Sequence, residues 1–118
     1  MLRIVTLNLN GIRSAARKGW IEWAAAQDAD VVCVQEVRAS AEDIGQEMRA
    51  FGGLTGHFNL AERKGCSGVG LYTRQAPRSL RAGFGCDEFD GEGRYLEADF
   101  GDVTVVSAYL PSGSSGDP

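Results

Sequence analysis

Residues 31–36 read Val31-Val32-Cys33-Val34-Gln35-Glu36, a continuous apolar run that ends on an amide and an acid. A short run of this kind is typical of a strand that is buried on both faces, and such strands belong to sheets covered by helices. The run therefore predicts an α/β fold: a mixed sheet with helices on one face.

A helix is predicted on the N-terminal side of this strand. Ser14 is a suitable N-cap for a helix over residues 15–27. Trp20 and Trp23 recur at helical spacing and share one face with Ala24. We interpret both tryptophans as core residues that pack on the sheet.

Further elements are predicted on the C-terminal side. Ser40 predicts the cap of a second helix over residues 41–50, and Gly101-Asp102 predicts a tight hairpin. Short strands are predicted over residues 2–8, 57–61, 68–73, 79–84, 95–100 and 103–109. The order is βαβα followed by a meander, without internal repeats.

The composition excludes several classes of protein. The 118 residues are enough for one domain or part of one, and 43% hydrophobic and 24% charged residues exclude a disordered or collagen-like chain. No run is long enough to span a membrane, and the N-terminus does not resemble a signal peptide. Three cysteines at unpatterned spacings favour a reducing compartment, so we expect a cytoplasmic location.

Charge is distributed unevenly along the chain. The net charge of −4 argues against a general nucleic-acid binder, whose surface is usually basic. However, Arg13, Arg17 and Lys18 lie close together, which allows a local basic face.

Three polar residues follow predicted strands directly: Asn8, Glu36 and Tyr109. Sites in α/β sheets gather at the carboxyl ends of strands, so these side chains would share one cleft if the strands are neighbours. A carboxylate with an amide oxygen suits Mg²⁺, which works with substrate phosphates. Each residue also has an ordinary explanation, as a surface acid, a turn residue or a half-buried strand end, and the pattern alone leaves both open.

Four sequence blocks add a resemblance to a known family. They are Thr6-Leu7-Asn8-Leu9-Asn10-Gly11-Ile12-Arg13, then Val34-Gln35-Glu36, then Gly65-Cys66-Ser67-Gly68-Val69-Gly70-Leu71-Tyr72-Thr73-Arg74, then Tyr109-Leu110-Pro111-Ser112-Gly113. In this order and spacing they resemble the exonuclease III family, the class II apurinic/apyrimidinic (AP) endonucleases of the endonuclease/exonuclease/phosphatase superfamily.

The resemblance implies a fold and an activity. The fold would be a four-layer α/β sandwich in which two sheets pack face to face with helices outside. The activity would be hydrolysis of DNA phosphodiesters with Mg²⁺ or Mn²⁺: incision 5′ to an abasic site, 3′→5′ exonuclease action and cleaning of 3′ ends. The partner would be double-stranded DNA with abasic sites or 3′ ends.

The resemblance also implies roles for residues. Glu36 matches the direct metal ligand, Asn8 matches a catalytic metal-site position, and Tyr109 matches the tyrosine that contacts the scissile phosphate. Asn10 and Arg38 match supporting positions around the metal site. The positions that match contacts to DNA are Arg13, Lys18, Arg94 and Ser112.

Part of the family pattern is not found in these 118 residues. The family continues with a Gly-Asp-x-Asn block, a further Asp and a Ser-Asp-His block, which orient the attacking water. The sole histidine, His57, is predicted to be structural. We therefore expect residues 1–118 to be the N-terminal part of a single domain, inactive and prone to association without a C-terminal half that largely supplies the second sheet.

Two other functions remain open at this point. One is a phosphatase or phosphodiesterase of the same superfamily that acts on smaller phosphate esters. The other is a non-catalytic fragment that binds DNA or a protein partner. The three basic residues Arg13, Lys18 and Arg94 favour a long polyanion over a small ester.

Overall fold

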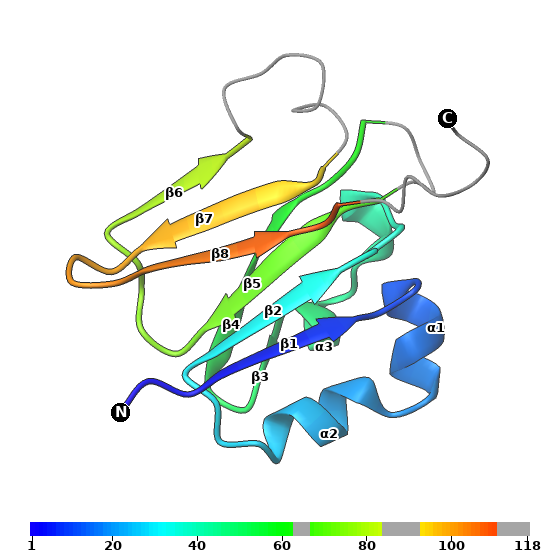
Figure 1. Ribbon diagram of the computed structural model, residues 1–118. Coiled ribbons are helices and arrows are strands. Elements are labelled where there is room, and N and C mark those ends of the chain that lie inside the picture. The colour runs from blue at the N-terminus through cyan, green and yellow to red at the C-terminus, as the bar shows by residue number, and fades with distance from the viewer. Residues whose placement is uncertain (63–66, 84–92, 111–118) are drawn as a thin grey trace.

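The computed structural model describes residues 1–62, 67–83 and 93–110, which form two sheets (Figure 1). The first sheet has the strand order β1-β2-β5-β4-β3 and the second β6-β7-β8. The strands are β1 (Ile4–Asn8), β2 (Val31–Gln35), β3 (Ala50–Phe51), β4 (Leu54–Asn59), β5 (Val69–Thr73), β6 (Ser79–Ala82), β7 (Tyr95–Asp99) and β8 (Thr104–Ala108). The helical segments are α1 (Ile12–Arg17), α2 (Trp20–Ala25), the 3₁₀ turn η1 (Ala41–Asp43) and α3 (Gln46–Arg49).

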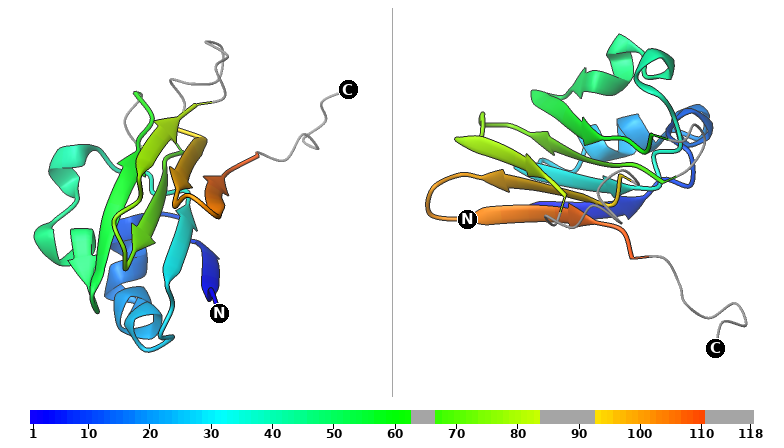
Figure 2. Two further views of the ribbon diagram at one scale, coloured as in Figure 1. Left: turned by 90° about the vertical axis from the view of Figure 1, so that its left-hand side faces the viewer. Right: turned by 90° about the horizontal axis from the view of Figure 1, so that it is seen from above.

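The elements form three layers, with helices, the five-stranded sheet and the three-stranded sheet in that order (Figure 2). Strand β2 lies in the middle layer, and the prediction that both its faces are buried is confirmed. Val32 and Val34 face the core formed with the helices, whereas Val31 and Cys33 face the core between the sheets. The predicted mixed sheet with helices on one face is confirmed, and the described residues supply three of the four expected layers.

The parallel pairing of β1 with β2 places the polar strand ends side by side. Asn8 is level with Gln35 in the ladder. The pairing continues past both strands, because the Gly11 N–H donates to the Glu36 carbonyl at 2.8 Å and the Ile12 N–H to the Val37 carbonyl at 2.9 Å. The loops after β1 and β2 are therefore held together at the carboxyl ends of these strands, where a site was predicted.

The predicted helix over residues 15–27 is wrong in its bounds. Helix α1 begins at Ile12 after Gly11, and Ser14 lies inside it instead of capping it. Gly19, with φ +93°, separates α1 from α2, because this left-handed backbone ends a helical path. After this break Trp20 is buried, whereas Trp23 is 49% exposed and is not the core residue that its spacing predicted.

The second predicted helix, over residues 41–50, is also shorter. Ser40 does cap a helical turn, in a capping box: its side chain accepts from the Asp43 N–H, and its own N–H donates to Asp43 Oδ2 at 3.3 Å. The turn is only η1, and α3 follows it separately. The chain then forms the hairpin of β3 and β4, so the strand predicted at residues 57–61 begins earlier, at Leu54.

The second sheet corrects a further prediction. Residues 79–108 supply its three strands, so the inner face of the first sheet is already covered within the chain. Strand β8 is not buried on both faces: Val105 and Ser107 point inward, whereas Thr104 and Val106 are exposed. The predicted hairpin at Gly101-Asp102 joins β7 to β8, and the Gly101 N–H donates to Asp99 Oδ1 at 2.7 Å.

Two smaller expectations concern His57 and membranes. His57 lies within β4, where its Nε2 is 3.2 Å from Thr73 Oγ1, and burial lowers its pKa. Its structural role is consistent with the prediction. Within the described ranges, none of the helices has the length and apolarity that crossing a membrane requires.

Candidate functional site

The two residues predicted at the ends of β1 and β2 meet in the structure. Asn8 Nδ2 donates to Glu36 Oε2 at 2.9 Å, while Asn8 Oδ1 accepts from the Asn10 N–H at 3.0 Å. Asn10 has φ +48°, a left-handed conformation that asparagine adopts more readily than most residues. Asn10 thus supports Asn8 through its backbone, and Asn8 in turn orients the carboxylate.

Two further side chains complete the surroundings of Glu36. Arg38 Nη2 lies 2.8 Å from Glu36 Oε1, and the Tyr109 hydroxyl donates to the same carboxylate. The structure therefore brings together the four residues Asn8, Glu36, Arg38 and Tyr109. The side chain of Glu36 is 13% exposed to solvent, so part of the carboxylate remains accessible.

Hydrogen bonds between the two sheets place Tyr109 over Glu36. The buried Ser107 hydroxyl donates to the Val34 carbonyl at 3.0 Å. Gln35 Nε2 donates to Ser107 Oγ at 3.3 Å and to Thr6 Oγ1 at 3.1 Å. The sequence analysis missed Ser107, although a hydroxyl at an inward-facing position of an apolar strand was the available signal.

Replacing Ser107 is expected to weaken this connection between the sheets. Ser107→Ala removes the hydroxyl that donates to the Val34 carbonyl and accepts from Gln35 Nε2. Because these groups are buried between the sheets, we expect the free energy of unfolding to fall by about 1–2 kcal/mol. Urea denaturation measures this loss. The control is Ser79→Ala on exposed β6, expected within about 0.5 kcal/mol of the wild type. Equal effects at both serines would contradict the assigned role.

The surroundings of Glu36 keep it ionised at neutral pH. The hydrogen bond from Asn8 is the main cause that lowers the pKa of Glu36 below 4.5, helped by Tyr109 and Arg38 and opposed by burial. Burial, together with the hydrogen bond to Glu36, raises the pKa of Tyr109. Tyr109 therefore stays protonated as a donor beside an anionic carboxylate.

The donor set fits a hard divalent cation with few protein ligands. No group of three or more His, Cys, Asp or Glu residues gathers within residues 1–62, 67–83 and 93–110. Mg²⁺ commonly keeps several waters and binds through one or two carboxylates plus substrate phosphates, which suits the single carboxylate of Glu36. Asn8 Oδ1 is a second hard oxygen, though its amide nitrogen faces Glu36.

The predicted basic residues lie around this centre in different places. Arg94 is beside Tyr109, because the Tyr109 N–H donates to the Arg94 carbonyl at 2.8 Å and the charge of Arg94 acts on the Tyr109 hydroxyl. Arg13 is half-exposed, with Nη1 3.8 Å from Asp43 Oδ1. Lys18 is exposed and lines a hollow of about 390 Å³ that also includes Asn8 and Asn10.

Some sequence predictions fall outside the described residues. This applies to Ser112, which the resemblance matches to a contact with DNA.

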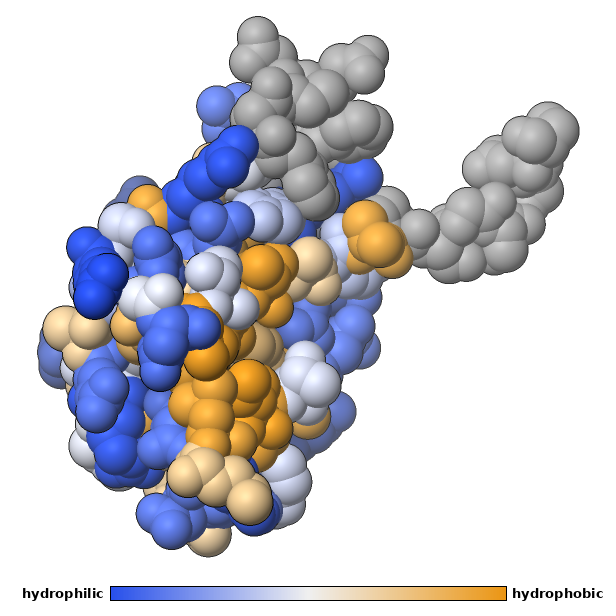
Figure 3. All heavy atoms as spheres, turned by 60° about the vertical axis from the view of Figure 1, so that its left-hand side comes forward, coloured by the Kyte–Doolittle hydropathy of each residue, from blue (hydrophilic) through white to orange (hydrophobic). Residues whose placement is uncertain are grey.

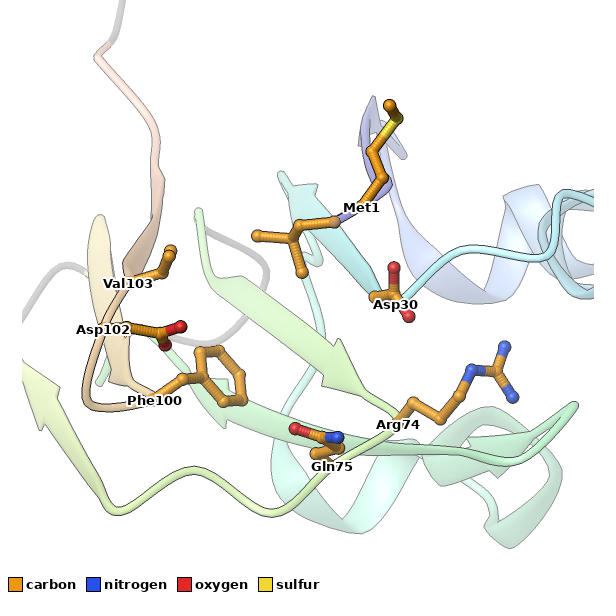
Figure 4. A pocket seen from close by; sticks show the side chains of 8 residues that line it. Met1, Asp30, Arg74, Gln75, Phe100, Asp102 and Val103 are labelled. Atoms are coloured by element: carbon orange, nitrogen blue, oxygen red, sulfur yellow. The ribbon is translucent and has the colours of Figure 1, made fainter.

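A separate hollow lies at the other end of the strands (Figure 4). It measures about 250 Å³ and lies between Met1, the side chain of Arg74 after β5, and Phe100 in the β7–β8 hairpin. Arg74 is held there by the Ala29 and Gly52 carbonyls. This hollow lies at the opposite end of β1 and β2 from Asn8 and Glu36, so it is separate from the site predicted at the carboxyl ends of these strands.

Comparisons with known proteins identify the family. Residues 5–118 match the Endonuclease/Exonuclease/phosphatase family. The chain belongs to this family. The exodeoxyribonuclease III of Haemophilus influenzae is 33% identical over 119 aligned residues, and these cover 97% of the chain and 43% of that protein. The DNA-(apurinic or apyrimidinic site) endonuclease of Dictyostelium discoideum is 29% identical, over 94% of the chain and 30% of that protein.

A solved structure agrees with both the fold and the family. The AP endonuclease from Archaeoglobus fulgidus superimposes with a TM-score of 0.81 at 26% identity, over 96% of the chain and 42% of that structure. The predicted resemblance to AP endonucleases is therefore confirmed. The chain spans less than half the length of each of these Endonuclease/Exonuclease/phosphatase family members.

Proposed function

We propose that this chain carries the metal-binding and phosphate-binding part of a Mg²⁺-dependent DNA-repair nuclease, with Mn²⁺ as a substitute. The observation that supports this most is the convergence of Asn8, Glu36 and Arg38 from the first sheet with Tyr109 from the second, in a chain similar to AP endonucleases. The proposed reactions are incision 5′ to abasic sites in duplex DNA, 3′→5′ exonuclease action and cleaning of 3′ ends.

Each residue has a role in this proposal. Glu36 holds the cation, and Asn8 orients the carboxylate through its amide. A bound cation stabilises the charge that develops on the phosphate during displacement. The protonated Tyr109, whose hydroxyl donates to Glu36 in the structure, turns this single donor to a phosphate oxygen when DNA binds, and the nearby Arg94 adds positive charge.

A cleavage assay separates the candidate functions. The protein at its natural full length is mixed with an end-labelled duplex containing one abasic site, in Mg²⁺ or in EDTA. We expect a single cut 5′ to the abasic site that requires Mg²⁺. Release of inorganic phosphate from small phosphate esters without cutting of DNA would instead favour the phosphatase branch. DNA binding without turnover would favour a non-catalytic role.

We propose further that residues 1–118 form the N-terminal part of one domain and are inactive alone. Among the described residues, the side chains that contact Glu36 are an amide, a phenol and a guanidinium, and none of these is an imidazole or a carboxylate that could activate water. Strands β1 and β8 are also open sheet edges with exposed Ile4 and Val106. Hydrophobic side chains gather into one band on the face drawn in Figure 3.

The isolated 118 residues are therefore expected to associate and to leave abasic DNA uncut in Mg²⁺, because open edges and apolar patches promote self-association. Sedimentation and a nicking assay measure both properties. A monomer that nicks abasic DNA would refute this proposal.

Three basic residues are expected to act through backbone phosphates. Replacing Arg13, Lys18 or Arg94 by alanine should weaken binding to all DNA sequences alike and reduce the slope of log affinity against log salt by about 1. Arg3→Ala is the matched control, since Arg3 lies before β1 at the end of the strand away from Glu36. A changed sequence preference with an unchanged salt slope would contradict this.

A further inference from the structure

A hollow lined by three arginines lies beside the Glu36 carboxylate. It measures about 340 Å³ and is lined by Gly11, Arg13, Ser14, Arg17 and Arg38. Arg38 belongs to both places, because it lines this hollow while its Nη2 lies 2.8 Å from Glu36 Oε1. One guanidinium is thus shared between the proposed cation site and a basic hollow.

The charges around the hollow favour an anion. Arg13 makes a long contact to Asp43, at 3.8 Å between Nη1 and Oδ1, and exposed pairs of this kind are weak. Asp43 is also engaged by Ser40. The acid that contacts Arg38 is Glu36, and a divalent cation bound there would neutralise the charge of this carboxylate. Three guanidinium groups beside a serine hydroxyl match the oxygens of a phosphate.

The backbone around Arg38 is held firmly, so its side chain is the part that can move. The Val37 N–H donates to the Gly68 carbonyl at 2.9 Å and the Arg38 N–H to the Ser67 carbonyl at 2.7 Å. Glu36 and Arg38 are both in the left-handed region, with φ +53° and +52°, and the side chain of the intervening Val37 is fully buried. The Arg38 side chain, by contrast, is 47% exposed.

We propose that Arg38 is a positioning residue that couples cation binding at Glu36 to phosphate binding in the arginine hollow. This inference rests on the proposed function. The Arg38 guanidinium and a divalent cation compete for the same carboxylate, because both are positive. When the cation binds, the contact between Arg38 and Glu36 breaks, and the released guanidinium binds a backbone phosphate together with Arg13 and Arg17. By linkage, DNA and the cation then strengthen each other's binding by the same factor.

The first test is a double-mutant cycle without metal. The affinity of a fluorescent 12-base-pair duplex is measured in EDTA for the wild type, Glu36→Gln, Arg38→Gln and the double variant. Glu36→Gln removes a negative charge, which tightens DNA binding whether or not Arg38 is present. It also frees the Arg38 guanidinium to bind phosphate, and this second gain in affinity requires Arg38. We expect the gain from Glu36→Gln to be at least about 5-fold larger in the wild-type background than in the Arg38→Gln background. Equal gains would overturn the inference.

The second test measures the cation directly. Arg38→Gln is expected to bind Mn²⁺ about 5-fold more tightly than the wild type in calorimetry, and Arg38→Lys to restore the wild-type value. Unchanged or weaker Mn²⁺ binding by Arg38→Gln would overturn the inference and leave the proposed function standing. A wild type that binds no Mn²⁺, or whose Mn²⁺ binding survives Glu36→Gln, would overturn both.

A third titration with inorganic phosphate identifies the source of the ligand. Coupling between Glu36 and Arg38 in the binding of the duplex, but not of inorganic phosphate, supports a backbone phosphate as the ligand. Coupling in the binding of inorganic phosphate, without coupling in the binding of the duplex, would overturn the assignment to DNA.

Discussion

Glu36→Gln is expected to reduce Mg²⁺-dependent cleavage of abasic DNA by about 100-fold or more in the protein at its natural full length. Glutamine keeps the length of the side chain but removes the charge that holds the cation, and a bound metal supplies several kcal/mol of transition-state stabilisation. Glu36 lies at a partly exposed strand end, so the melting temperature should change little. Single-turnover cleavage and thermal melting measure the two effects.

The matched control is Glu42→Gln in η1, which makes the same chemical change on an exposed carboxylate six residues away. It should leave cleavage unchanged. Near-normal cleavage by Glu36→Gln in Mg²⁺ would remove the basis for the proposed metal site.

The pKa of Glu36 adds a pH dependence to this result. Because the hydrogen bond from Asn8 lowers the pKa of Glu36 below its ordinary value of 4.5, the carboxylate stays ionised as the pH falls through that value. Its contribution to stability and to cation binding is therefore present above pH 4.5 and is lost only as the pH falls through the lower, folded-state pKa.

Trp20→Ala is expected to lower the free energy of unfolding by about 3–5 kcal/mol, a large part of the stability of a small domain. Trp20 is 6% exposed and packs edge-on against Phe51, with ring centroids 5.4 Å apart, and against Tyr72 at 5.5 Å. Tyr72 is itself anchored by the hydrogen bond that its hydroxyl donates to the Met48 carbonyl at 2.7 Å. Truncation would leave a cavity between α2 and the first sheet.

Trp23→Ala on the same helix is the control for this prediction. Trp23 is 49% exposed, so the same truncation removes less buried surface and should cost less than about 1 kcal/mol. Urea denaturation with unchanged m-values measures both. A similar loss at the two tryptophans would show that the packing of α2 differs from the structure.

The sequence by itself determined the buried strand at residues 31–35 and the three strand ends at Asn8, Glu36 and Tyr109. The buried strand and the meeting of Asn8 with Glu36 follow from local patterns, because an apolar run needs cover on both faces and polar residues that follow neighbouring parallel strands lie together. Tyr109 follows β8 of the other sheet, so only the packing of the two sheets brings it to Glu36. The four motif blocks also sufficed for the family. The bounds of the helices were less well predicted, because Gly19 breaks a pattern whose apolar spacing continues through it.

Only the tertiary structure decided which side chains meet. The bond from Ser107 to Val34 joins residues 73 positions apart, and it exists because two sheets pack in one particular register. The place of Arg38 between Glu36 and the arginine hollow likewise depends on a loop held by Gly68 and Ser67 and on α1 beginning at Ile12. Sequence spacing reports neighbours along a strand or helix, whereas contacts between layers are set by the packing of the whole core.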